Sequence, residues 1–149
     1  MVSFKGSRSG GLARTDFAVG DSTSRHFVLV EFENAVENSV FKIKNRDAKK
    51  LIPEWSARFE HGFSQLVDWT WIMTESRQAP VIKAAFRGEV KGWTLLLVAG
   101  RKGKISSQEL ERLEWRTAHA AVQGRKVHHV TFDELYEDLR ARAHQAPLV

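Results

Sequence analysis

Apolar residues in this chain gather in short runs separated by polar stretches, and two of the runs have the length of a buried strand. Residues 27–33 read FVLVEFE, and residues 93–99 read WTLLLVA. Continuous apolar runs of this length predict strands that are covered on both faces. Shorter apolar segments at residues 15–19 and 126–130 predict two further strands, and the first of these can pair with residues 27–33 as a hairpin.

Three other segments carry the signals of helices. Residues 56–74 place apolar side chains three and four positions apart, which predicts a helix, and Pro80 prevents its extension. We expect the next helix to end at Gly124 and the last to run to about Ala143. These two helices begin at capping boxes, in which Ser or Thr precedes Glu by three residues: Ser106 with Glu109, and Thr131 with Glu134.

The order of these elements predicts the class of fold. Helices alternate with apolar strands, which indicates an α/β domain with a mixed β-sheet flanked by helices. The 149 residues fit one domain, which we place at residues 14–146. Residues 1–13 are rich in Gly, Ser and basic side chains and predict a flexible basic arm. Residues 34–53 have no clean period and predict a polar, basic loop.

Composition narrows the classes of function. The net charge of +5 and the pI of about 9.7 favour a polyanionic partner. Cysteine is absent, which excludes disulfides, cysteine–zinc sites and cysteine nucleophiles. No apolar run approaches the roughly 18–20 residues of a membrane span, and the N-terminus lacks the apolar stretch of a signal peptide. We therefore expect a cytoplasmic protein that does not enter a membrane.

Three carboxylates provide the clearest candidate chemistry. Glu31 and Glu33 end an apolar strand two positions apart, so both side chains project from one face. Asp16, on the preceding strand, can come within reach of Glu31 in a hairpin. Converging carboxylates suit a hard cation such as Mg²⁺, which can activate water and stabilise charge on a phosphodiester. The alternative is that the Glu-x-Glu pattern only marks where a strand emerges into water.

Five stretches of the sequence together carry a resemblance to a known family. In order they read RTDFAVG, FVLVEFENA, HGFSQLVDWTWI, TLLLVAGR and VTFDELYEDLRARA, and they cover the chain from about Arg14 to Ala143. The ordered set resembles the Shedu anti-phage nuclease domain, within the PD-(D/E)XK nuclease superfamily. The resemblance implies a restriction-endonuclease-like core, DNA as the substrate, and cleavage that depends on Mg²⁺ or, as a substitute, Mn²⁺.

The resemblance also implies roles for individual residues. Asp16 and Glu31 would bind the metal ion, and Gln65 is the glutamine of the family's helix, which would position water or phosphate. Glu33 stands where most of the superfamily has lysine. It cannot supply lysine's positive charge and is expected to act as a further metal ligand or as a general base. Asp16, Glu31, Glu33 and Gln65 are therefore the predicted catalytic residues.

Basic side chains near these positions are candidates for binding DNA phosphates. Lys42, Lys44 and Arg46 follow the acidic strand, and Arg101 is the arginine of the family's Gly-Arg pair. A DNA enzyme needs such a flank because its own carboxylates repel the substrate. Lys42 or Lys44 could also replace the charge that Glu33 lacks. The alternative is that these residues belong to an ordinary solvated loop.

Two other functions stay open at this point. The first is a nuclease-fold module that binds DNA or a protein partner without cutting, which Glu33 and the short segment before Asp16 favour. The second is a structural α/β domain, which a large distance between Asp16 and Glu31 would support. The family resemblance implies a homo-oligomer. Trp69 and Trp71 cannot both face inward on one helix, so one of them could serve as a contact between subunits or as a stacking surface.

Overall fold

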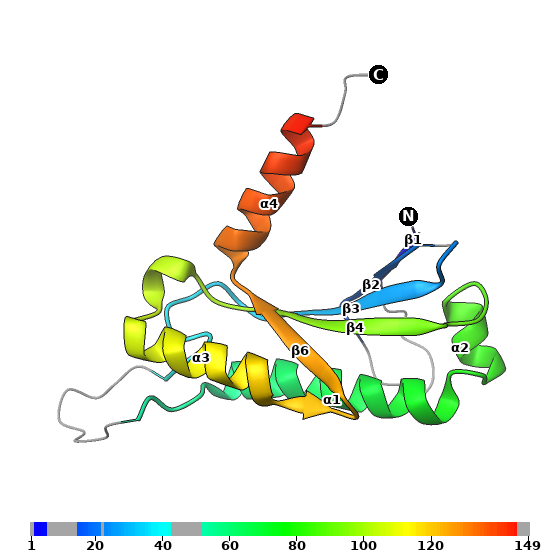
Figure 1. The fold of residues 1–149 in the computed structure, drawn as a ribbon, viewed down its shortest axis with the longest axis horizontal. Coiled ribbons are helices and arrows are strands. Elements are labelled where there is room, and N and C mark those ends of the chain that lie inside the picture. Colours follow the sequence, from blue (N-terminus) through cyan, green and yellow to red (C-terminus); the bar gives the residue numbers. More distant parts are fainter. Residues whose placement is uncertain (1, 6–14, 22, 43–51, 146–149) are drawn as a thin grey trace.

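The computed structural model describes residues 2–5, 15–21, 23–42 and 52–145. Six strands form its sheet in the order β1-β2-β3-β4-β6-β5, and the mixed α/β class predicted from the sequence is confirmed (Figure 1). Strands β1, β2 and β3 are antiparallel, β3, β4 and β6 are parallel, and β5 pairs antiparallel with β6. The strands are β1 (Val2–Lys5), β2 (Phe17–Gly20), β3 (His26–Phe32), β4 (Gly92–Val98), β5 (Ala121–Val122) and β6 (Arg125–Val130).

The helices begin where the sequence places capping residues. The hydroxyl of Ser56 accepts a hydrogen bond from the backbone of Phe59 in the first turn of α1, and both predicted capping boxes are formed. Within the described ranges, every helix is too short or too polar to cross a membrane. The helices are α1 (Ala57–Ser76), α2 (Pro80–Ala85), the 3₁₀ turn η1 (Lys102–Lys104), α3 (Ser107–His119) and α4 (Phe132–Gln145).

The two faces of the sheet are covered differently. Helices α1 and α3 lie along one face, and α4 leaves the end of β6 and projects from the opposite side (Figure 1). Strands β3 and β4 alternate accordingly: Leu29 and Leu95 are fully buried beneath α1, whereas Val28 and Leu96 on the other face are half-buried. Each fully buried leucine contributes about 1.5–3 kcal/mol relative to an exposed one. The core therefore lies on the side of α1.

One arginine fixes α3 against α1. The guanidinium of Arg116 donates to both carboxylate oxygens of Glu60, at 2.6 and 2.9 Å. Its central carbon lies 4.2 Å from the ring centroid of Phe63 and 4.7 Å from that of Trp55. A guanidinium that is both bidentate and stacked on aromatic rings cannot be replaced by a simple point charge. Arg116 therefore holds the two covering helices in a defined arrangement.

Three local predictions differ from the structure. Helix α3 ends at His119 instead of Gly124, and Gly124, with a φ of 74°, forms the turn between β5 and β6. Pro80 begins α2 as well as limiting α1, since proline is well suited to the first turn of a helix. Strand β1 lies in the segment predicted as an arm. Residues 6–14 are outside the described residues, so the flexibility of the arm stays a prediction.

Candidate functional site

The hairpin of β2 and β3 brings two predicted site residues together. Phe17 pairs with Val30, so the antiparallel register, continued by one residue, places Asp16 opposite Glu31. The carboxylate of Asp16 accepts a hydrogen bond of 2.9 Å from the backbone N–H of Phe32, which holds it at the end of the strand. Asp16 and Glu31 are therefore neighbours. A purely structural domain would have been supported by a large distance between Asp16 and Glu31. The pairing of the two strands does not provide that support.

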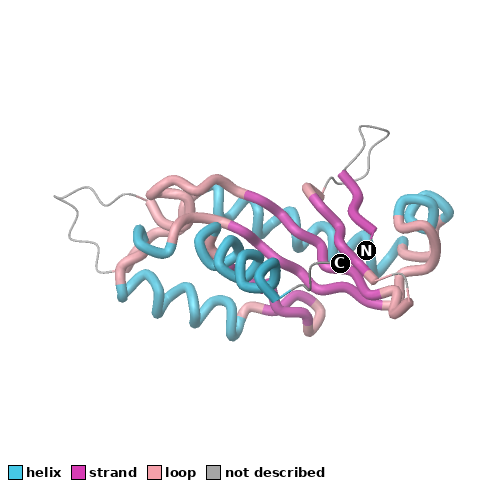
Figure 2. The backbone as a smooth tube through the Cα atoms, turned by 90° about the horizontal axis from the view of Figure 1, so that it is seen from above, coloured by secondary structure: helices cyan, strands magenta, loops and turns pink. Residues whose placement is uncertain are grey.

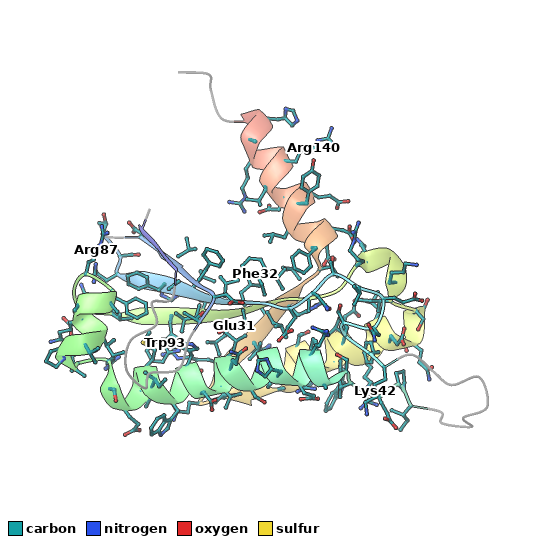
Figure 3. The ribbon with its side chains drawn as sticks, turned by 180° about the vertical axis from the view of Figure 1, so that it is seen from behind. Glu31, Phe32, Lys42, Arg87, Trp93 and Arg140 are labelled. Carbon is teal, nitrogen blue, oxygen red and sulfur yellow. The ribbon has the colours of Figure 1, made fainter. Side chains whose placement is uncertain are left out.

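Glu31 is a buried acid that lies near two other carboxylates, those of Asp16 and Glu33. Only 2% of its surface is exposed, and its side chain lies on the α1 face, as Figure 3 shows. Burial, reinforced by the negative charge of Asp16, raises the pKa of Glu31 to about 8. Hydrogen bonds from the backbone of Asp16 and from Thr15 oppose the rise. Its Oε1 atom has no hydrogen-bond partner among the described residues.

Glu33 is directed toward helix α1. Its Oε1 lies 3.0 Å from Nδ1 of His61. The side chain of Glu33 passes over Gly62. A Cβ atom added at Gly62 would lie 3.1 Å from Cγ of Glu33 and 2.6 Å from Cδ1 of Leu97. The glycine therefore leaves the space through which Glu33 reaches the histidine. The sequence analysis had identified neither the pairing of Glu33 with His61 nor the role of Gly62.

We expect Gly62→Ala to lower the free energy of unfolding by about 1–3 kcal/mol, because the new methyl group overlaps the buried side chain of Leu97. In an open helix the same change would be stabilising. Urea unfolding measures the difference. Gly103→Ala is the matched control, since nothing lies within 4 Å of its added Cβ. Equal stability of wild type and Gly62→Ala would contradict the close packing at this position.

Helix α1 and the strand ends form the walls of a surface pocket. The pocket has a volume of about 560 Å³ and is lined by Asp16, Phe32, Glu33, Ala57, Arg58, His61 and Gln65. Arg58, His61 and Gln65 are spaced three and four residues apart and thus share one face of α1. That spacing could have identified Arg58 from the sequence. Gln65 and two of the three predicted carboxylates therefore meet in one pocket, with Glu31 buried behind it.

The carboxylates share one end of the sheet without forming a tight cluster. In the described part of the chain, no group of three or more His, Asp and Glu side chains is close enough to hold a metal ion. The separation follows from the contacts: Glu33 reaches His61, while Asp16 binds the backbone beside Glu31. The carboxylate oxygens of Asp16 and Glu33 and the amide oxygen of Gln65 are nevertheless of the type that Mg²⁺ prefers, and His61 adds a ring nitrogen to the same pocket.

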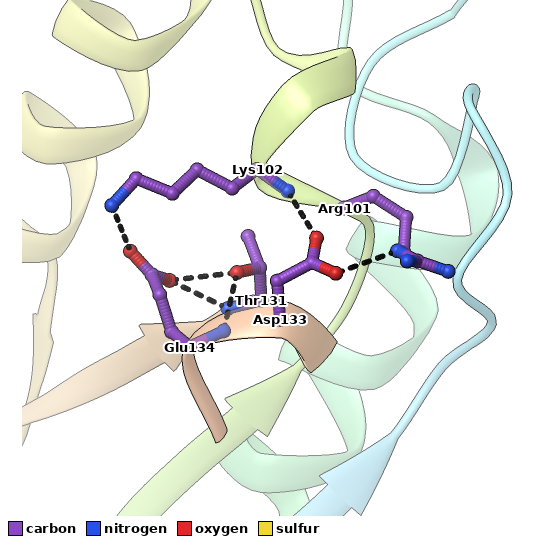
Figure 4. A network of polar contacts seen from close by, with 5 residues as sticks. All are labelled: Arg101, Lys102, Thr131, Asp133 and Glu134. Carbon is purple, nitrogen blue, oxygen red and sulfur yellow. Dashed lines mark hydrogen bonds and ion pairs between the residues drawn. The ribbon is translucent and has the colours of Figure 1, made fainter. Parts of the chain in front are cut away.

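Two of the predicted DNA-binding residues, Lys42 and Arg101, lie outside this pocket. Lys42 pairs with Glu54 at 3.0 Å and lies away from Glu31 (Figure 3). Arg101 pairs with Asp133 at 2.9 Å, and the same carboxylate accepts from the backbone of Lys102, which fastens η1 to the start of α4 (Figure 4). Neither Lys42 nor Arg101 lines the pocket, so Arg58 is the arginine that accompanies the carboxylates there. Lys44 and Arg46 lie outside the described residues.

Comparison with protein families identifies one matching family model. The model is described as Shedu protein SduA, C-terminal, and it matches residues 2–136. The match extends from β1 into α4 and includes every residue of the pocket. No curated protein matches the chain.

Proposed function

This chain belongs to the Shedu SduA C-terminal family of anti-phage defence proteins, and we propose that it is a divalent-metal-dependent DNA endonuclease with a restriction-endonuclease-like core. The observation that carries the proposal is the buried acid Glu31. It lies beside a second carboxylate, its pKa is raised, and one of its oxygens has no partner. Burying such a group is costly, and perturbed acids of this kind cluster at functional sites.

The residues present fit a hard cation in their chemistry. Asp16 and Glu31 would hold it, with Glu33 as a further ligand on release from His61. The Oε1 atom of Glu31 is buried and has no hydrogen-bond partner among the described residues, so it has a lone pair to offer to a cation. When bound, the ion would activate water and neutralise developing charge on the phosphodiester. A positive charge at this position would also favour the ionised form of Glu31, because it offsets the burial that raises the pKa.

The other pocket residues act on the substrate. Arg58 is exposed at the pocket and binds a phosphate oxygen of the DNA, supplying the charge that Glu33 cannot. Gln65 donates from its amide to the phosphate or orients the attacking water. The partner of Glu33, His61, holds that carboxylate at the pocket wall. Each role requires only side chains that already face the same cavity.

The second candidate function is a nuclease-fold module that binds DNA or a protein without cutting. The observation that favours it is the contact between Glu33 and His61, which leaves the described residues without a compact group of three ligands. Such a module would bind DNA with a strong dependence on salt. It would release no cleavage product under any metal condition.

Nicking of supercoiled plasmid distinguishes the two functions. We expect the wild-type protein to nick DNA with Mg²⁺ or Mn²⁺ and not with EDTA, and Asp16→Asn to be inactive while it retains an acceptor for the Phe32 amide. Asp68→Asn is the matched control, because Asp68 is an exposed aspartate on α1. Salt-sensitive binding by a wild-type protein that never cuts would replace the endonuclease proposal with the second candidate.

We expect Arg58→Ala to weaken binding to a labelled duplex roughly tenfold and to reduce the dependence of the affinity on salt by about one phosphate contact. The reason is that Arg58 is the arginine lining the pocket. Fluorescence anisotropy in EDTA measures binding without cleavage. Arg77→Ala, at the opposite end of α1, should change the affinity much less. If both variants lose equal affinity, Arg58 contributes only general positive charge.

A further inference from the structure

A second pocket lies between α3, the end of β6 and the start of α4. Seen from above, α4 stands nearly end-on over the strands, while α3 lies to one side of them (Figure 2). The pocket has a volume of about 270 Å³, and among the described residues none lines both this α3–α4 pocket and the pocket of Asp16 and Glu33. A cavity of this size is near the lower limit for small-molecule sites, so it admits a ligand of one or two rings.

Part of the lining of the α3–α4 pocket is apolar. Ile105 packs against the hydrophobic core, and Leu113 is only 4% exposed. Leu110 lies three residues before Leu113 and therefore on the same face of α3, but it is 45% exposed. The pocket thus presents apolar surface that the domain leaves in contact with water. A ring placed over Leu110 would remove that surface from water, which is favourable.

His129 contributes a hydrogen-bond acceptor to the lining. Its Nε2 atom lies 3.0 Å from the carbonyl oxygen of Ala99, and because a carbonyl can only accept, Nε2 carries the hydrogen. Burial lowers the pKa of His129, so the ring is neutral at pH 7 and its Nδ1 atom is an acceptor. Nδ1 forms no hydrogen bond with the residues that the structure describes. The ring packs against Phe59, with 5.6 Å between the ring centroids, which holds its orientation.

Two carboxylates add negative charge. Oε2 of Glu134 accepts from the backbone and the hydroxyl of Thr131, whereas Oε1 lies 3.9 Å from the ammonium of Lys102, too far for a hydrogen bond (Figure 4). The side chain of Lys102 is 68% exposed, so this contact is weak. In the described part of the chain the carboxylate of Glu114 has no ion pair, and the hydroxyls of Thr117 and Thr131 already donate within the protein. The pocket therefore offers acceptors and negative charge in excess of donors.

The spacing of these acceptors suits an organic cation. No three His, Asp or Glu side chains of the described residues are close enough to share a metal ion. An organic ligand can carry its donors several ångströms apart and so reach acceptors on α3, β6 and α4 separately. An anion would meet two carboxylates and a ring nitrogen that cannot donate, which disfavours it.

We propose that the α3–α4 pocket binds a small aromatic amine, in which a protonated amino group is attached to an apolar ring. The ammonium would pair with the carboxylates of Glu114 and Glu134, and such charge-assisted hydrogen bonds are the strong ones. A donor on the ring would bond to Nδ1 of His129, and the ring itself would cover Leu110. The pocket is separate from that of Asp16 and Glu33, so the proposal does not depend on the nuclease function.

NMR titration with three probes of similar shape tests the class of ligand. Tryptamine, tryptophol and indole-3-acetate carry a cation, a hydroxyl and an anion on the same indole ring. We expect tryptamine to bind with a Kd of roughly 0.1–1 mM, tryptophol to bind at least about fivefold more weakly, and indole-3-acetate not to bind below about 10 mM. The amide shifts caused by tryptamine should be largest near Leu113 and His129 and small near Asp16.

Two conservative substitutions test the carboxylates. Glu114→Gln and Glu134→Gln should each weaken tryptamine roughly three- to tenfold and leave tryptophol nearly unchanged, because glutamine keeps the size of the side chain and removes its charge. Glutamine at position 134 can still complete the capping box with Thr131, so the fold is retained. Glu111→Gln is the matched control, since Glu111 is exposed on α3 and does not line the pocket.

Four outcomes would overturn the proposal. The first is no binding of tryptamine up to about 10 mM. The second is binding of tryptophol or indole-3-acetate as tight as that of tryptamine. The third is a set of shifts that lies outside the α3–α4 pocket, and the fourth is an equal loss of affinity in Glu111→Gln and Glu114→Gln.

Discussion

Glu31→Gln is expected to abolish cleavage and, in the same protein, to raise the free energy of unfolding at pH 8 in the absence of metal. Loss of a ligand that holds the ion should lower the rate roughly 10²–10³-fold or more. The gain in stability arises because glutamine keeps the size of the side chain but never carries its charge. A functional residue that destabilises the folded state typically behaves in this way: its substitution lowers the activity and raises the stability.

The pH dependence follows from the pKa of Glu31. Its folded pKa is raised to about 8, above the ordinary value of 4.5 that applies to the unfolded chain. The unfolded chain therefore releases this proton first, and the wild type loses stability as the pH rises from about 4.5 to 8. The loss attributable to Glu31 amounts to roughly 3–5 kcal/mol over that interval. Below pH 4.5 the carboxyl is protonated in both states, and the loss disappears.

Urea unfolding of wild type and Glu31→Gln at a series of pH values measures this difference directly. We expect the two proteins to converge near pH 4.5 and the variant to be the more stable by a few kcal/mol at pH 8. Excess Mg²⁺ should stabilise the wild type and have a much smaller effect on the variant. Glu111→Gln, at an exposed position on α3, is the control. A constant difference at all pH values would show that Glu31 is not a buried acid with a raised pKa.

Arg116→Ala is expected to lower the free energy of unfolding by about 2–4 kcal/mol. The change removes two charge-assisted hydrogen bonds to Glu60 and the contacts of the guanidinium with Phe63 and Trp55. The carboxylate of Glu60 is partly exposed, so water recovers part of its hydrogen bonding, and the loss stays below that of a fully buried pair. The docking of α3 against α1 should weaken most.

Thermal and urea unfolding, with hydrogen exchange of the amides of α3, measure the effect. Arg116→Lys keeps the charge but not the shape of the side chain. It should lose more than half as much stability as Arg116→Ala, because an ammonium cannot form the bidentate pair or stack on the rings. Arg112→Ala removes a neighbouring guanidinium that lies 5.2 Å from the Trp55 ring, and should cost under about 1 kcal/mol. Equal losses for Arg112→Ala and Arg116→Ala would indicate that the ion pair with Glu60 contributes little.

Features that depend on neighbours in the sequence could be predicted without the structure. The capping boxes of Ser106 and Thr131 join residues three positions apart, and both are formed. The strands at residues 27–33 and 93–99 were placed within one residue of β3 and β4, because a continuous apolar run is stable only in a buried strand. Gly124 shows the limit of local signals. A glycine in the left-handed region can end a helix or form the turn of a hairpin, and the sequence does not distinguish the two. In the structure β5 pairs with β6, so Gly124 forms a hairpin turn.

The sequence by itself therefore determined the α/β class, most of the elements, and the proximity of Asp16 to Glu31, since hydrophobic periodicity, capping and hairpin register are short-range properties. Only the tertiary structure decided that Glu31 is buried and Glu33 is not, that Glu33 reaches His61, and that Arg58 and not Lys42 accompanies the carboxylates. It alone left α4 projecting from the sheet. These properties depend on which surfaces meet when α1 packs on β3 and β4. Contacts between residues distant in the chain set burial and charge pairing, and spacing along the sequence does not encode them.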